Sequence, residues 1–137
     1  MKILAIALSL MLGLSLLITI NCRPTRCECI SLKQAENIVL YKIVRADTME
    51  WDTTKIRVYE LPYQFKKGDT LSNMRIYRIL ERECWYFFID DRPQPDWANC
   101  RPCRHILIYC DATYEVINDE CGVPCWRYWD DMIELSW

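Results

Sequence analysis

Cysteine is the residue type with the greatest chemical potential in this chain, which has nine cysteines among 137 residues. Four of them form two close pairs, Cys100 with Cys103 and Cys121 with Cys125, and 17 residues separate the pairs. This spacing is close to that of a four-thiolate zinc site. In an exported chain of this size, however, oxidation turns the same arrangement into disulfides. The sequence therefore favours disulfides for these four residues, leaves their pairing open, and predicts no metal or cofactor of the chain's own.

Cys27 and Cys29 are separated by one residue, Glu28. Cysteines at this spacing cannot bond to each other without severe strain, so each has to reach a distant cysteine. Two such bonds would attach this segment to the rest of the protein at two points.

Residues suited to catalysis are few. The only histidine, His105, begins an apolar stretch, where a structural role is favoured over that of a general base. Two pairs of adjacent acids, at residues 90–91 and 130–131, are expected at a solvated strand end and on a helix surface. Three glycines in the whole chain are too few for a loop that cradles phosphates. We therefore expect a protein that is not an enzyme.

The N-terminal residues 1–22 have the form of a secretory signal, with Lys2 ahead of an apolar run over residues 3–20. Cleavage after Cys22 would leave eight cysteines, an even number, whereas cleavage after Asn21 would leave nine. An uncleaved anchor is the alternative, because about 17–25 apolar residues can span a bilayer. Both alternatives place residues 27–137 outside the cytosol, and cleavage predicts a secreted protein without a membrane segment.

Residues 23–137 are short enough for one domain with one core. Without Lys2 this part has 16 basic and 19 acidic residues, a net charge of −3. Nucleic-acid binding depends on a surplus of basic residues, so the composition argues against it.

Helix signals lie near both ends of this domain. Ser31 and Gln34 have the spacing of a capping box, which predicts a short helix from Leu32 to about Glu36. Pro124 can begin a last helix that runs to Trp137 with its tryptophans near one face.

Strand patterns fill the chain between these helices. Residues 38–44 are rich in β-branched and aromatic types, and residues 55–61 and 74–79 alternate apolar with charged side chains. Continuous apolar runs at 84–89 and 105–110 predict buried strands, and 113–117 a short further strand. We expect a mainly β fold, an OB-type barrel of five to six strands, closed or partly open, with short helices beside it. A two-sheet sandwich is the alternative.

The order of several motifs resembles a known family. The Cys27-x-Cys29 start is followed by SLKQAENIVLYKIV at 31–44, YQFKKG at 63–68 and ILIYCD at 106–111. Together they resemble the netrin-like domain of the tissue inhibitors of metalloproteinases, in a short and divergent form, from Cys27 to about Asp111. The resemblance implies a five-stranded OB-type barrel, and it implies two disulfides, Cys27–Cys84 and Cys29–Cys110.

The same resemblance implies a function. In such inhibitors the first cysteine is the N-terminus, and its α-amine and carbonyl chelate the catalytic zinc of an extracellular metalloproteinase. Carried over, Cys27 is the chelator, Glu28 enters the pocket beside the zinc, and Cys29, Ile30 and Ser31 complete an inhibitory wedge.

The chelation mechanism requires that Cys27 be the first residue, because a peptide nitrogen is not a useful zinc ligand at neutral pH. Arg23 and Arg26 form an Arg-x-x-Arg sequence after which secretory convertases cut, and this cut would expose Cys27. A chain that keeps residues 23–26 leads to the second hypothesis, a non-inhibitory cysteine-rich module that binds a receptor or a matrix protein.

Overall fold

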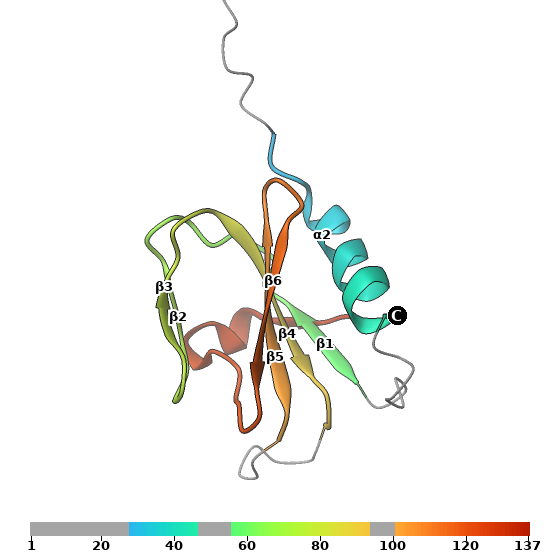
Figure 1. Cartoon of the computed structure of the whole chain (residues 1–137), viewed down its shortest axis with the longest axis vertical. Coiled ribbons are helices and arrows are strands. Elements are labelled where there is room, and N and C mark those ends of the chain that lie inside the picture. The colour runs from blue at the N-terminus through green and yellow to red at the C-terminus, as the bar shows by residue number, and fades with distance from the viewer. Residues whose placement is uncertain (1–27, 47–55, 94–100) are drawn as a thin grey trace, which may run out of the picture.

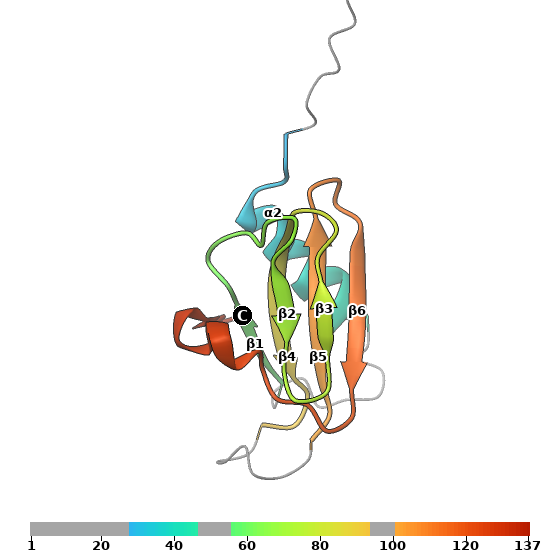
Figure 2. The ribbon, with the colours of Figure 1, turned by 90° about the vertical axis from the view of Figure 1, so that its left-hand side faces the viewer.

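The computed structural model describes residues 28–46, 56–93 and 101–137. Its centre is an antiparallel sheet of five strands in the order β6-β5-β4-β1-β7. A helix covers one face of this sheet, and a two-stranded hairpin lies over the other face (Figures 1 and 2). The mainly β prediction is therefore confirmed. The strands of the sheet are β1 (Arg57–Glu60), β4 (Cys84–Asp90), β5 (Cys103–Tyr109), β6 (Tyr114–Asp119) and β7 (Ile133–Glu134), and those of the hairpin are β2 (Thr70–Ser72) and β3 (Tyr77–Ile79).

The sheet is open in the part of the chain that the structure describes. Its outermost strands, β6 and β7, are neighbours of β5 and β1 and do not pair with each other. A closed barrel needs such a pairing, so of the two predicted forms, closed and partly open, the closed form is not found in the described residues.

The helix begins as the sequence predicts. The Ser31 hydroxyl accepts a hydrogen bond from the Gln34 backbone N–H at 3.3 Å, and the Gln34 side-chain oxygen accepts one from the Ser31 N–H at 2.9 Å. These reciprocal bonds form a capping box, which satisfies two backbone donors at the start of α2 (Leu32–Ile38).

The helix does not end near Glu36 as predicted, and the predicted strand over 38–44 is wrong. A wider helical segment, η1 (Val39–Val44), continues α2 with bonds that span five residues. Ala35, Val39 and Ile43 recur at every fourth position and are buried against the sheet. A stripe with this period is buried by a helix, and its burial outweighs the preference of β-branched residues for strands.

The two central strands, β4 and β5, explain the continuous apolar runs. Their alternate side chains enter two separate clusters, so that Tyr86 and Leu107 face the hairpin while Phe87 and Ile106 face the helix. Both faces of the strand pair are covered, and no polar face is needed. Strands lie within the predicted segments 55–61, 74–79, 84–89, 105–110 and 113–117, or overlap them, whereas β2 and β7 were not predicted.

The C-terminal helix is shorter than predicted. Only η3 (Trp126–Asp131), a 3₁₀ helix, forms, and it positions Trp129 with its ring centroid 5.0 Å from that of Tyr59. The chain then becomes extended at Met132 and adds β7 to β1. Backbone pairing with the sheet replaces the rest of the predicted helix.

The adjacent acids at 90–91 are paired with arginines rather than solvated. Asp90 and Arg101 form an ion pair at 3.0 Å in which both side chains are 2% exposed. Asp91 accepts two hydrogen bonds from Arg104, at 2.6 and 3.0 Å.

None of the described helices is both long and apolar enough to cross a membrane. The predicted signal at 1–22 and both cleavage positions lie outside the described residues.

Candidate functional site

Residues 28–31, here called the N-terminal ridge, lie against the end of the sheet where the β5–β6 turn is found (Figure 1). Cys29 forms a disulfide with Cys110 at the end of β5. The Ile30 backbone N–H donates to the Cys110 carbonyl at 3.3 Å, and the Trp85 indole N–H donates to the Ile30 carbonyl at 2.8 Å. A covalent bond and two hydrogen bonds therefore fix the ridge on the sheet, and the predicted Cys29–Cys110 disulfide is confirmed.

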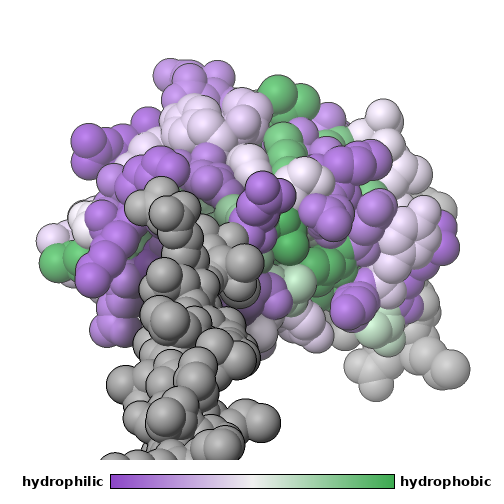
Figure 3. Space-filling view, turned by 90° about the horizontal axis from the view of Figure 1, so that it is seen from above, coloured by the Kyte–Doolittle hydropathy of each residue, from purple (hydrophilic) through white to green (hydrophobic). Residues whose placement is uncertain are grey.

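The ridge borders a shallow pocket of about 530 Å³, formed with the β3–β4 and β5–β6 turns. Arg82 lies over the Tyr109 ring, 3.6 Å from its centroid, and contacts Asp111 at 3.2 Å. Hydrogen bonds from Thr113 lower the pKa of the Asp111 carboxyl, which keeps it ionised. Figure 3 shows that hydrophilic residues cover most of this end of the molecule, with a smaller hydrophobic area among them. The site can therefore present fixed charges to a partner.

The predicted wedge residues differ in their exposure and in the contacts that they make. Glu28 is exposed at the outer end of the ridge, whereas Cys29 and Ile30 are partly buried. The Ser31 hydroxyl is used in capping α2. Cys27, the predicted chelator, and the processing residues Arg23 and Arg26 lie outside the described residues.

The predicted Cys27–Cys84 disulfide is not present, because Cys84 is a free, fully buried thiol. Cys84 pairs with Tyr109 in the sheet, and both side chains belong to the cluster that faces the hairpin. Cys110, the residue after Tyr109, lies on the other face, where the ridge joins it. Burial raises the pKa of the Cys84 thiol to about 12, so it stays protonated at neutral pH.

The prediction that the last four cysteines form disulfides is confirmed only in part. Cys121 is disulfide-bonded, and its partner is not one of the other described cysteines. Cys103 and Cys125 are free, buried thiols, so disulfides for these two are a wrong prediction, and Cys100 lies outside the described residues. A four-thiolate site is excluded as well, because the bonded Cys121 sulfur is not a thiolate.

His105 is buried in the core, as a structural histidine would be. Its Nδ1 lies 2.8 Å from the Tyr86 hydroxyl, and its Nε2 lies 3.3 Å from the Asn73 side-chain nitrogen. Burial lowers the pKa of His105 to about 4, so the ring is neutral at pH 7.

One group of metal-ligating residue types lies within the described residues. Cys103, His105 and Asp119 are all buried, and their ligand atoms lie within 4.8 Å of one another. The sequence offers a partial signal, since Cys103 and His105 are two apart in a strand and share a face. Asp119 could not be found in this way, because it joins them only through the pairing of β6 with β5.

Comparisons with protein-family models, with curated proteins and with solved structures find no match to this chain.

Proposed function

We propose that this chain is a secreted inhibitor that inserts its N-terminal ridge into the active-site cleft of an extracellular zinc metalloproteinase. The observation that carries the proposal is the Cys29–Cys110 disulfide, which fixes the ridge on the sheet. A segment already held in one conformation loses little conformational entropy on binding. The helix beside a five-stranded sheet further supports a netrin-like, OB-type relationship.

The zinc ligand in this proposal is the α-amine and carbonyl of Cys27, the residue directly before the ridge. A chain that begins at Cys27 has a free amine one residue before Glu28, and an unprotonated amine binds zinc. The exposed Glu28 carboxylate then enters the pocket beside the metal. Burying an unpaired carboxylate is costly, so the proposal favours a protease whose pocket provides a cation or hydrogen-bond donors.

The test compares three forms of the protein: one that begins at Cys27, one with a single alanine added before Cys27, and one that begins at Arg23. Each is assayed against a panel of zinc metalloproteinases with a fluorogenic peptide substrate. The form that begins at Cys27 should inhibit most strongly, and the added alanine should weaken inhibition about 100-fold, or ~2.7 kcal/mol. Equal inhibition by the alanine form would exclude chelation by the Cys27 amine.

A second candidate is a non-inhibitory module for a receptor or matrix protein, and the free Cys84 favours it. The family resemblance implies that a bond from Cys84 holds the inhibitory first residue, and the Cys84 thiol is free. Large apolar side chains are also exposed on the hairpin, where Met74 is 85% and Tyr77 is 75% exposed. This candidate predicts that the form beginning at Cys27 leaves every protease in the panel active.

A further inference from the structure

Cys103, His105 and Asp119 meet at the end of the sheet opposite to the N-terminal ridge. Cys103 begins β5 and is the direct partner of Asp119, which ends β6. His105 follows two positions later on the same face of β5, and all three side chains are at most 6% exposed. The pairing of β5 with β6 thus brings a thiol, an imidazole and a carboxylate together inside the protein.

These three donor types are those of protein-bound zinc, which takes cysteine sulfur, histidine nitrogen and carboxylate oxygen. Ligand atoms around a tetrahedral zinc lie roughly 3.3–3.8 Å apart, given metal–ligand bonds of about 2.0–2.3 Å. The three ligand atoms here lie within 4.8 Å of one another. Small side-chain shifts are therefore enough to close them around one ion.

The surrounding groups orient the imidazole for metal binding. The amide nitrogen of Asn73, a donor, lies 3.3 Å from His105 Nε2, so Nε2 is an acceptor. The ring proton is then on Nδ1, which donates to the Tyr86 hydroxyl at 2.8 Å. Metal-binding histidines usually donate their second ring N–H in this way. The Nε2 lone pair faces the Asn73 amide, which an ion displaces from it on binding.

The carboxylate is oriented as well. Asp119 Oδ1 accepts a hydrogen bond from the Cys121 backbone N–H at 3.2 Å and lies 3.8 Å from the Arg75 guanidinium. Asp119 Oδ2 lies 3.4 Å from the Asn73 side-chain nitrogen. One oxygen is thus held by the backbone, and the other is directed toward the histidine side of the group.

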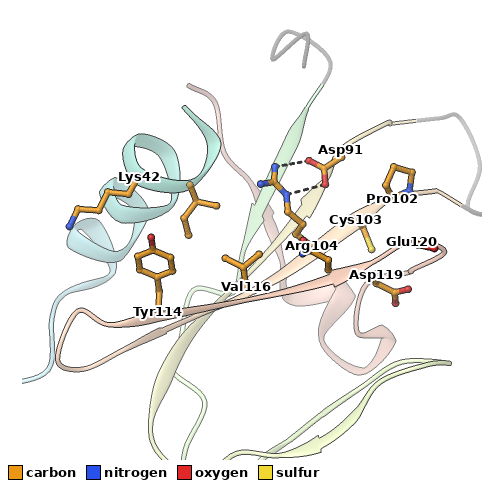
Figure 4. Close-up of a pocket in the computed structure, with 11 residues that line it drawn as sticks. Lys42, Asp91, Pro102, Cys103, Arg104, Tyr114, Val116, Asp119 and Glu120 are labelled. Atoms are coloured by element: carbon orange, nitrogen blue, oxygen red, sulfur yellow. Dashed lines mark hydrogen bonds and ion pairs between the residues drawn. The ribbon is translucent and has the colours of Figure 1, made fainter. Parts of the chain in front are cut away.

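Gly122 packs directly against two of the ligand atoms, which a side chain at this position would displace. A Cβ atom at this position would lie 2.2 Å from Cys103 Sγ and 2.7 Å from Asp119 Oδ2. Cys103 and Asp119 also line a pocket of about 490 Å³ beside the helix (Figure 4).

From this arrangement we propose a zinc site with Cys103 Sγ, His105 Nε2 and Asp119 Oδ2 as its protein ligands and a water molecule in the fourth position. The Cys103 thiol loses its proton to solvent as the sulfur–zinc bond forms. The ion joins the start of β5 to the end of β6 and so cross-links these two strands. This site is separate from the ridge and does not depend on inhibition.

The test uses the full secreted chain that begins at Arg23, so that the amine of Cys27 does not bind metal. Cobalt(II) is the probe, because a cysteine thiolate bound to it gives a charge-transfer absorption band in the near ultraviolet. Wild type should show this band at one cobalt per chain, and zinc should remove it by displacement. Cys103→Ser should lose the band, and Asp119→Asn should bind cobalt at least about tenfold more weakly.

The matched control is Cys84→Ser, which removes an equally buried free thiol at the other end of the sheet and should keep the band. Three results would overturn the zinc site. They are the absence of the band in wild type, its retention in Cys103→Ser, and a Cys103 disulfide in peptide maps of the non-reduced protein. The protease assay is independent, so failure of the metal site and failure of the proposed inhibition are distinguishable.

Discussion

Glu60 on β1 is a buried acid whose carboxyl group is not fully hydrogen-bonded. Its side chain faces the helix, the residue is 7% exposed, and its Oε2 has no hydrogen-bond partner among the described residues. Burial is the main cause that raises the pKa of Glu60. Repulsion from Glu36 adds to the rise, and attraction to Lys33 opposes it. The folded protein therefore binds this proton more firmly than the unfolded chain does.

A raised carboxyl pKa gives the pH dependence a definite sign. The contribution of Glu60 to stability is most favourable below the carboxyl pKa of the unfolded chain, and it declines as the pH rises through the folded pKa. Glu60→Met removes the buried charge at similar volume. We expect it to raise the free energy of unfolding by about 1–3 kcal/mol at pH 7, with a smaller gain at pH 3.

Urea unfolding of wild type and Glu60→Met between pH 3 and pH 8 measures this effect. Glu81→Met, at an exposed position, is the matched control and should show no such trend. A Glu60→Met protein less stable than wild type at pH 7 would mean that the carboxylate has a favourable partner.

At the scale of the element, the start of helix α2 is determined by nearby residues, whereas its end is determined by distant ones. The capping box involves residues three apart, so the sequence displays it in full. The end of the helix depends on the buried stripe of Ala35, Val39 and Ile43, whose partners are on the sheet. Residue preferences over 38–44 favour a strand, and only the contact with the sheet reverses that preference.

Ser31→Ala tests the contribution of the cap. It removes the hydroxyl that accepts from the Gln34 N–H, so we expect a loss of about 1 kcal/mol in the free energy of unfolding. The amides of the first helical turn should also exchange faster with solvent. Ser136→Ala, at an exposed position in the C-terminal segment, should leave both measurements unchanged. An unchanged stability in Ser31→Ala would show that sheet packing alone holds the start of the helix.

At the scale of the whole molecule, the Cys29–Cys110 disulfide joins positions 81 residues apart. A cross-link over such a distance restricts the unfolded chain strongly. Replacing both cysteines with alanine should lower the free energy of unfolding by ~2–4 kcal/mol. It should also weaken the proposed inhibition, because the ridge would be held only by its hydrogen bonds.

Urea unfolding with and without a reducing agent measures the effect of this disulfide. In the reducing agent, wild type also lacks the bond, so the difference between the two proteins should shrink. A difference of the same size under both conditions would assign the loss to altered packing rather than to the cross-link.

The sequence by itself determined the features that depend on nearby residues. These are the helix start at Ser31 and the central strands β4 and β5 with their continuous apolar runs. Hydrogen bonds and side-chain periods over a few residues produce each of them, so they can be read without a partner segment. The resemblance added the Cys29–Cys110 pair.

Only the tertiary structure decided which distant residues share a face or a strand register. In the folded chain, residues 38–44 are helical and the Cys84 thiol is free in the core. Asp119 lies opposite Cys103 in the sheet. A register shift of one residue would move Asp119 to the other face of the sheet, because successive side chains in a strand point in opposite directions. The packing of the whole core selects that register, and no short stretch of sequence contains it.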